Sequence, residues 1–301
     1  MAVHLEAIAP GVLYLPGAQN IGIIPTEQDR GAIVIDTGLT RDTGKAILKA
    51  LDAAGLRPAA ILNTHAHADH FGGNAFLVEK TGVPVYAPAY EEAFLRYPRL
   101  EAVGLFAGAA PIAALQGRFL LAPASPVDYI VTPGPLRIDG VALEAVPLPG
   151  HSAGQTGYLV RDVLFSGDLV MPPTVLDKYG IVYCHDVAAH LESLERMPAV
   201  AATWHLPAHH PPTRDLAPLV AANRDRFRDT LAQIRRLLAQ GPMEAGAIQA
   251  ELCGHYNINI TTTEGFFLLQ PTIYAHLSCL AGQGEVEFAV VEGRGLWRLR
   301  E

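Results

Sequence analysis

Short apolar runs alternate with helix-forming patterns along the first half of the chain. Each run has the length and composition of a buried strand, and together they cover residues 21–25, 32–36, 59–63 and 83–87. Thr40 or Asp42 is suited to cap a helix that Gly55 ends, and a second helix is predicted over 74–80. This alternation predicts a layered α/β fold.

The second half continues with strands and then changes character. Further strands are predicted over residues 129–131, 141–147, 157–160, 163–166 and 200–204. A helix is expected over 187–197, and a polar helix runs from about Leu216 to Gln240. Two short helices, 243–253 and 272–281, are then followed by a pair of strands, an order that resembles a winged-helix module.

Residues 97–126 are rich in Ala, Gly, Pro and Leu without a regular period, which indicates an insertion or a lid. Within them, residues 102–122 carry a single charge over 21 residues, close to the length of a membrane span. Pro111, Gly117 and Arg118 interrupt this stretch, so we expect a buried or lid-forming segment and no span. Plain core packing and a homodimer contact remain alternative uses of these residues.

The composition is that of a folded protein with a sizeable core. Of 301 residues, 50% are hydrophobic and 17% are charged, which argues against disorder. The net charge of −8 disfavours nucleic acid as a partner, because binding to phosphates needs basic surfaces. Three scattered cysteines, and an N-terminus that lacks the features of a secretory signal, predict a cytoplasmic protein.

The segment from His65 to His70 (HAHADH) holds three histidines and one aspartate within six residues, directly after a predicted strand. In extended backbone, residues i and i+2 project to the same side, so His65 and His67 can bind one cation together. Asp69 and His70 fall in the following turn and can face a second cation. Imidazole with carboxylate suits zinc, iron, manganese or nickel. The alternative is an ordinary polar loop.

Three later loops offer further ligands of the same kind. His151 follows one predicted strand, Asp168 follows another, and His209 and His210 follow a third, each beside a Gly or Pro turn. Loops at strand ends on one edge of an α/β sheet converge, and ligand sites form there. These side chains are therefore expected to join the histidine segment in one site.

The motifs HAHADH, PGHS, SGD and LPAHH, in this order, resemble the hallmark of the metallo-β-lactamase superfamily. The early sequence IDTG, which contains Asp36, is similar to the start of that family. The resemblance implies a four-layer αββα sandwich over residues 1–215, with a dinuclear metal site at one edge. Residues 216–301 would form a separate helical, winged-helix-like module. Asp36 would orient one imidazole, or would only form a turn.

The resemblance also implies the ligands of each ion. Metal one would be held by His65, His67 and His151, metal two by Asp69, His70 and His209, with Asp168 bridging both. His209 is favoured as the last ligand over His210, because it follows the proline of the motif at the usual distance, and His205 is an outside candidate. Two divalent transition-metal ions are expected, with zinc first and iron, manganese or a mixed pair as alternatives.

Such a site predicts a metallohydrolase that acts on a small molecule. Two ions share a water, lower its pKa towards ~7, and so provide a hydroxide that attacks an ester, lactone, thioester or similar carbonyl. Asp69 and Asp168 are the predicted catalytic carboxylates. A phosphodiesterase or ribonuclease of the same fold, and a non-hydrolytic iron oxygenase or oxidoreductase, are the alternatives. Arginines cluster between Arg224 and Arg236, but they alternate with acids, which is typical of a solvated helix face.

Overall fold

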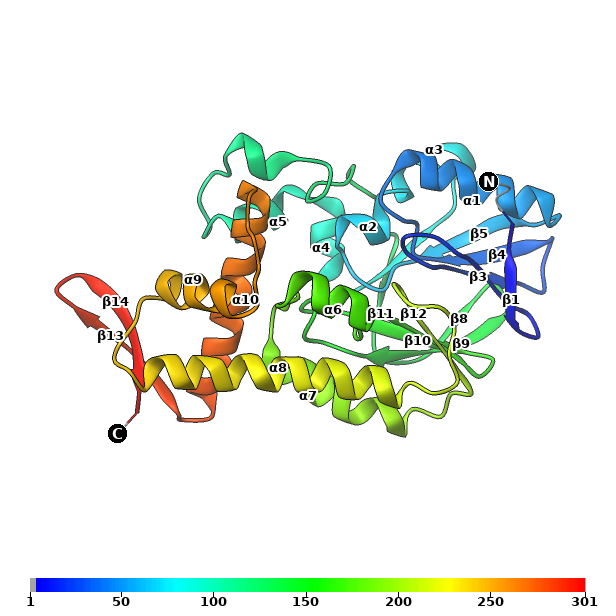
Figure 1. The fold of residues 1–301 in the computed structure, drawn as a ribbon. Coiled ribbons are helices and arrows are strands. Elements are labelled where there is room, and N and C mark those ends of the chain that lie inside the picture. The colour runs from blue at the N-terminus through cyan, green and yellow to red at the C-terminus, as the bar shows by residue number, and fades with distance from the viewer. Residues whose placement is uncertain (1–3, 301) are drawn as a thin grey trace.

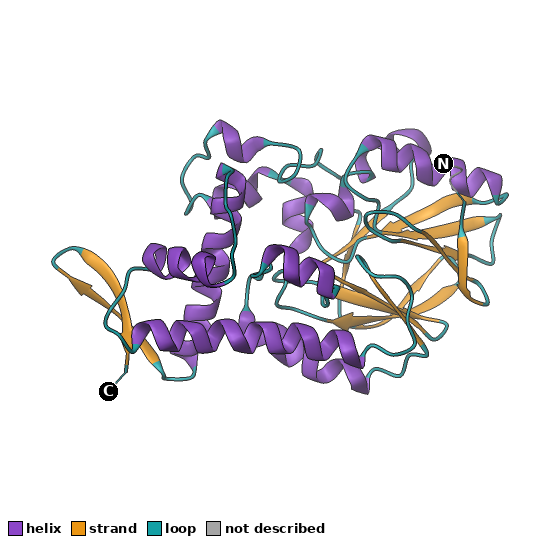
Figure 2. Ribbon diagram, in the orientation of Figure 1, coloured by secondary structure: helices purple, strands orange, loops and turns teal. Residues whose placement is uncertain are grey.

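The computed structural model describes residues 4–300, and these form two facing β-sheets with helices on both outer sides (Figures 1 and 2). The first sheet has the order β1-β2-β3-β4-β5-β6-β7, with β1 Glu6–Ala9, β2 Val12–Leu15, β3 Ile21–Pro25, β4 Gly31–Ile35, β5 Arg57–Leu62, β6 Val85–Pro88 and β7 Tyr129–Val131. The second has the order β12-β11-β10-β9-β8, with β8 Gly134–Ile138, β9 Val141–Pro147, β10 Thr156–Val160, β11 Val163–Gly167 and β12 Trp204–Pro207. This is the predicted αββα architecture.

Hydrophobic side chains fill the spaces between the layers. Ile33 and Leu62 of the first sheet pack with Tyr158 and Phe165 of the second in one buried cluster. A second cluster joins the first sheet to the outer helices α1 (Arg41–Ala53) and α3 (Asn74–Thr81). A third packs the second sheet against α7 (Val187–Arg196) and the start of α8 (Ala217–Leu238). Each layer is therefore held by burial of its apolar face.

The first outer helix begins and ends as its sequence predicts. The Thr40 hydroxyl accepts a hydrogen bond from the backbone N–H of Thr43, which satisfies one free donor of the first turn. Gly55 follows the last turn with a φ of +69°, a conformation that glycine adopts without a steric penalty. Both ends are thus fixed by local side-chain and backbone chemistry.

The C-terminal part consists of α8, α9 (Ala245–His255), α10 (Thr263–Gly282) and a hairpin of β13 (Val286–Val291) and β14 (Arg294–Leu299). The order of helices and strands is as expected, and the winged-helix comparison stays a prediction. The expected boundary after residue 215 falls in the loop between β12 and α8 and also stays a prediction. One hydrophobic cluster contains residues from both sides of it, including Met171 and Val187 with Phe227 and Ile273.

Two predicted elements differ from the structure. Helix α10 begins at Thr263, well before the expected start at 272, and Pro271 lies inside it. Proline is common near helix starts, but here the Thr262 hydroxyl caps the helix by accepting from the N–H of Gly265. The strand expected at 200–204 lies later, as β12, where it pairs in parallel with β11.

Several short elements had no clear sequence signal. Strands β1 and β8 and the helices α2 (Ala68–Phe71), α4 (Glu91–Arg96) and α6 (Pro173–Tyr179) were not predicted. They are short, so their periodic patterns cover too few residues to be recognised.

The expected insertion contains α5 (Arg99–Leu105) and the 3₁₀ turn η1 (Ala113–Gln116). Its buried residues Leu105 and Leu115 form a small cluster, and Phe267 and Leu268 of α10 pack against it. The apolar segment therefore packs against the C-terminal part. Within residues 4–300, no helix is both long and apolar enough to cross a membrane.

Candidate metal centre

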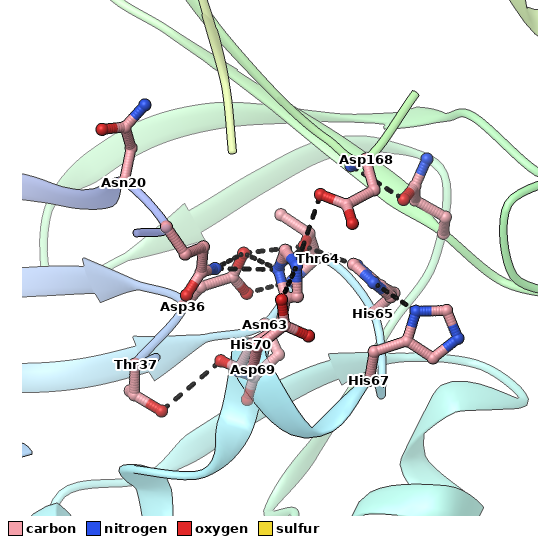
Figure 3. Close-up of polar contacts among 12 residues, drawn as sticks. Asn20, Asp36, Thr37, Asn63, Thr64, His65, His67, Asp69, His70 and Asp168 are labelled. Carbon is pink, nitrogen blue, oxygen red and sulfur yellow. Dashed lines mark hydrogen bonds and ion pairs between the residues drawn. The ribbon is translucent and has the colours of Figure 1, made fainter. Parts of the chain in front are cut away.

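The loops at one edge of the sandwich bring all seven predicted ligands together. His65 and His67 follow β5, Asp69 and His70 lie in α2, His151 follows β9, Asp168 follows β11, and His209 follows β12. Their ligand atoms form three overlapping groups, His65–His67–His151, His65–His70–Asp168 and Asp69–His70–His209, with the atoms of each group within 4.8 Å of one another. Figure 3 shows five of these side chains converging.

The first cluster consists of three imidazoles that face one another. Nε2 of His65 lies 3.0 Å from Nδ1 of His67, and Nε2 of His151 lies 2.9 Å from the same Nδ1. Zinc–nitrogen bonds of about 2.0–2.1 Å in tetrahedral geometry place ligand nitrogens roughly 3.3 Å apart. The spacing therefore suits three nitrogens around one cation.

The second cluster combines imidazoles with carboxylates. Oδ2 of Asp69 lies 3.8 Å from Nε2 of His70 and 3.5 Å from Nε2 of His209. Oδ1 of Asp168 lies 3.3 Å from Nε2 of His70 and 3.4 Å from Nε2 of His209. The other oxygen of Asp168, Oδ2, lies 3.5 Å from Nε2 of His151 in the first cluster. Asp168 thus presents one oxygen to each cluster.

Two buried atoms between the clusters support the fit of cations. Nε2 of His70 and Oδ1 of Asp168 are buried, and in the described part of the chain they make ion pairs with each other and with Asp69 and His209 but no hydrogen bond. Buried polar atoms without hydrogen bonds are rare in folded proteins, because each costs the free energy of its lost hydration. A cation between them satisfies both, so the donor set and its geometry fit divalent metal ions.

Two imidazoles of the first cluster, His65 and His151, are in the form that binds metals. Burial, followed by the neighbouring imidazoles, holds the pKa of His65 well below its ordinary value. Burial, with the nearby His67, likewise lowers the pKa of His151 to about 3. Both rings are therefore neutral at pH 7, with a free nitrogen lone pair for a cation.

The carboxylates are ionised for a different reason. Burial alone would raise the pKa of Asp168, but His209 and His70 outweigh it and hold this pKa well below its ordinary value. Burial opposes ionisation of Asp69 in the same way, yet the same histidines lower its pKa to about 2. Both side chains therefore carry a negative charge at pH 7 and can bind a cation.

The two histidines of the second cluster are protonated at pH 7 when no cation is bound. Burial lowers the pKa of His70, but Asp168, Asp69 and Asp36 outweigh it and raise this pKa well above its ordinary value. Asp168 is the main cause that raises the pKa of His209 to about 10. A cation at this position must displace these protons, because a protonated imidazole has no free lone pair.

Asp36 fixes the orientation of His70. Its Oδ2 lies 2.8 Å from Nδ1 of His70, which directs the Nε2 of that ring towards the cluster. The backbone N–H and the hydroxyl of Thr64 each donate to Asp36 at 2.8 Å. Asp36 is buried and has a φ of +60°. Of the two roles expected for Asp36, these contacts support orientation of an imidazole.

Backbone carbonyls orient two other imidazoles. Nδ1 of His151 donates to the carbonyl of Tyr183 at 3.2 Å, and Nδ1 of His209 donates to the carbonyl of Ala18 at 2.8 Å. Nδ1 of His210 instead donates to the carbonyl of Pro211, and His210 belongs to none of the three ligand groups. The side chain of His205, on β12, is likewise outside the groups.

Glu91 is a supporting residue that the sequence did not reveal. This buried side chain, on α4, accepts hydrogen bonds from the backbone N–H of Ala66 at 2.8 Å and of Gly154 at 2.6 Å. It also accepts from the hydroxyl of Ser152 at 2.8 Å. One carboxylate therefore connects the loop of His65 and His67 to the loop of His151. Glu91 lies in no motif, so sequence spacing offered no signal.

Gly72 and Gly73, which follow the histidine segment, are required for close packing. Gly72 has an ordinary φ of −59°, and Gly73 has a φ of −84°. A Cβ on Gly72 would lie 2.0 Å from the carbonyl oxygen of Leu39, and one on Gly73 would lie 2.5 Å from that of Thr37. The two glycines allow the histidine loop to pack closely on neighbouring backbone.

Two facing sheets with ligand clusters at one edge define a metal-dependent hydrolase of the αββα class. The family model described as Metallo-beta-lactamase superfamily matches residues 14–238, and the chain belongs to this superfamily. The expected family and fold are thereby confirmed, and the chain is a metallohydrolase like its named relatives.

Three curated relatives illustrate the range of the family. The chain is 32% identical over 167 residues to "Probable metallo-hydrolase YqgX" of Bacillus subtilis, which covers 55% of this chain and 71% of the relative. It is 26% identical over 315 residues to "Atrochrysone carboxyl ACP thioesterase" of Passalora fulva, and the match covers 97% of this chain and 82% of that protein. Hydroxyacylglutathione hydrolase of Methylobacillus flagellatus is 32% identical, but the match covers only 46% of this chain and 42% of that protein.

Solved structures show that the fold extends over the whole chain. A β-lactamase domain protein from Burkholderia ambifaria superposes with a TM-score of 0.77 at 24% identity, over 98% of this chain and 93% of the other. A metallo-β-lactamase family protein from Thermus thermophilus gives a TM-score of 0.75 at 22% identity, over 98% and 100%. The C-terminal part is thus included in the shared fold.

The protonation of the second cluster predicts a pH-dependent metal affinity. At pH 7, filling the second position should release about two protons, from His70 and His209, whereas His65 and His151 should release none when the first is filled. Affinity at the second position should therefore fall as the pH is lowered. Calorimetric titration of the metal-free protein with zinc, in buffers of different ionisation enthalpy, counts these protons. Equal proton release at both positions would contradict the assignment.

The contacts of Glu91 predict a loss of stability and of metal affinity in Glu91→Gln. The amide group of glutamine cannot accept from all three donors, so unfolding should become easier by about 1.5–3 kcal/mol. Glu92→Gln is the matched control, since Glu92 forms an ion pair with Arg96 on the same helix and should change stability by less than about 1 kcal/mol. Urea unfolding and zinc titration measure both effects, and equal behaviour of the two variants would refute this role of Glu91.

Proposed function

We propose that the protein hydrolyses a small-molecule ester, lactone or thioester with two divalent metal ions, zinc first. The observation that carries this proposal is the position of Asp168, whose two oxygens face different ligand clusters. His65, His67 and His151 would hold one ion, and Asp69, His70 and His209 the other. An iron, manganese or mixed pair remains the alternative for the native metal.

Ions bound in this way supply an ionised water and polarise a carbonyl oxygen. The chain's own residues determine where the carbonyl lies. His67, Asp69, His151 and Asp168 line a cavity of about 640 Å³, within the usual size range for small-molecule sites. The side chain of Asp69 is 39% exposed, so it can accept a hydrogen bond from the attacking water and hold it towards the carbonyl carbon.

The relatives support a thioester or ester rather than a phosphodiester. Two kinds of named relative, hydroxyacylglutathione hydrolase and ACP thioesterase, act on thioesters according to their names. The arginines of α8, which were considered for nucleic-acid binding, are engaged within the fold. Arg226, Arg228 and Arg235 pair with Asp177, Glu195 and Glu285. This supports the interpretation of a salt-bridged helix face.

Location and assembly stay predictions. Cys184, Cys253 and Cys279 are free thiols, which is compatible with the expected reducing cytoplasm. A homodimer remains a hypothesis from the apolar residues of the insertion, of which Phe119 is 71% exposed.

A substrate panel and one variant test the proposal. Wild-type protein should bind about two metal equivalents and hydrolyse thioesters, esters or lactones in preference to phosphodiesters. Asp168→Ala should lower the metal content and reduce turnover by roughly a thousandfold, because it removes the ligand shared by both positions. Asp177→Ala, a matched loss of an exposed carboxylate, should change neither. RNA cleavage without activity on carbonyl esters would overturn the proposal.

Adjacent histidines allow the final ligand to be tested directly. His209→Ala should lose about one metal equivalent and most of the activity, whereas His210→Ala should retain both, because only His209 faces Asp69 and Asp168. Elemental analysis with a matched activity assay separates the two variants. The reverse result would assign the ligand to His210.

A further inference from the structure

A second cavity, of about 560 Å³, opens from the same ligand cluster between the sandwich and the C-terminal part. We propose that this cavity binds an apolar acyl chain, so that the preferred substrates are acyl thioesters or esters with chains of medium length. This inference rests on the proposed carbonyl hydrolysis and adds the substrate class. The name acyl pocket is used below for this cavity.

Apolar side chains form much of the wall of the acyl pocket. Its apolar lining comes from α6, the following loop, the loop between α9 and α10, and α10 itself, and includes Met171, Val175, Ile181, Ile258, Ile260 and Leu268. The acidic and histidine residues that line it are Asp69, His151 and His209, all from the predicted metal ligands. A hydrocarbon chain placed there leaves water without burying an unpaired polar group of its own.

Two hydroxyls of the lining have partners within the protein, and the lining also includes the polar side chains of Asn259, Thr261 and Tyr183. The Thr262 hydroxyl accepts from the N–H of Gly265, and the Thr272 hydroxyl accepts from the N–H of Cys184. The hydroxyls of Thr262 and Thr272 thus serve to hold the pocket wall.

The first cavity is also lined largely by apolar groups, including Phe119 and Leu120, but it carries more charged side chains. It meets the acyl pocket at Asp69, His151, Tyr183, Thr262, Gly265 and Leu268. Beyond this junction its lining includes the charged residues Glu101, Arg118 and Glu264. A carbonyl at the ligand cluster therefore lies between two largely apolar cavities, and of these the first carries charged side chains beyond the shared residues. An acyl compound with a polar leaving group matches this division.

The C-terminal part is held in place to form the pocket wall. Helix α10 packs against α5, α7 and α8, and Figure 1 shows it standing beside the sandwich between α5 and α8. Gly180, which ends α6, lies against the loop after α9, where a Cβ would come within 2.9 Å of Ile258. The wall is thus fixed from both sides, as a pocket with chain-length selectivity requires.

The preference for acyl chains is tested with a series of thioesters from acetyl to dodecanoyl on one leaving group. The value of kcat/KM should rise roughly fourfold for each added methylene until the pocket is filled, because each buried methylene contributes a nearly constant free energy of transfer. A flat series, with acetyl hydrolysed as well as octanoyl, would overturn the inference while leaving the proposed function intact.

Two tryptophan variants test whether the acyl chain of the substrate lies in the acyl pocket. Val175→Trp places a large side chain in the acyl pocket and should lower the octanoyl-to-acetyl ratio of kcat/KM at least tenfold. Val290→Trp is the matched control in the C-terminal hairpin, where Val290 is 71% exposed, and should leave the ratio unchanged. An unchanged ratio in Val175→Trp would place the chain elsewhere and refute the inference.

A binding measurement separates this inference from the proposed function. Decanoate should bind the purified protein at least a hundredfold more tightly than acetate, with a negative heat-capacity change, and Val175→Trp should weaken decanoate alone. If decanoate binds but no carbonyl ester is hydrolysed, the proposed function fails and the apolar site stands. If decanoate binds no better than acetate, the inference fails.

Discussion

The burial of carboxylates beneath the histidine loop is the constraint on which the site depends. Asp36 and Glu91 are almost completely excluded from water, and their partners are backbone N–H groups, hydroxyls, the amide of Gln19 and one imidazole. A buried carboxylate is tolerated only when its oxygens are hydrogen-bonded, so each one fixes the loops that supply its donors. The ligand side chains are thereby held in position by the fold before any substrate arrives.

Most of the site could be predicted from the sequence, because the ligand types are concentrated next to strand ends. His65, His67 and His70 stand in one short segment, and Asp168 follows a buried strand. Glu91 could not be found in this way. A single carboxylate near the start of a helix has no distinctive spacing, and its partners lie 25 to 63 positions away in the chain.

The fold could be predicted where hydrophobic patterns extend over many residues. It could not be predicted where tertiary contacts determine the bounds or the position of an element. Alternating strands and helices, with the Thr40 cap, indicated the layers of the sandwich. Helix α10 was predicted too short, because Pro271 resembles a helix start while the true cap is Thr262. The approach of α10 to the ligand cluster could not be predicted, since it depends on packing between the insertion and residues about 150 positions later.

One cluster of apolar side chains continues from the sandwich into the C-terminal helices, and the loop before α10 lines a cavity beside the ligands. Residues 258–265 contribute no side chain to the ligand groups. Exchange of amino acids in this short stretch can therefore alter which molecules enter without disturbing the ion-binding loops. Under the proposed function, the segment that selects the substrate and the loops that hold the ions are therefore separate parts of this chain.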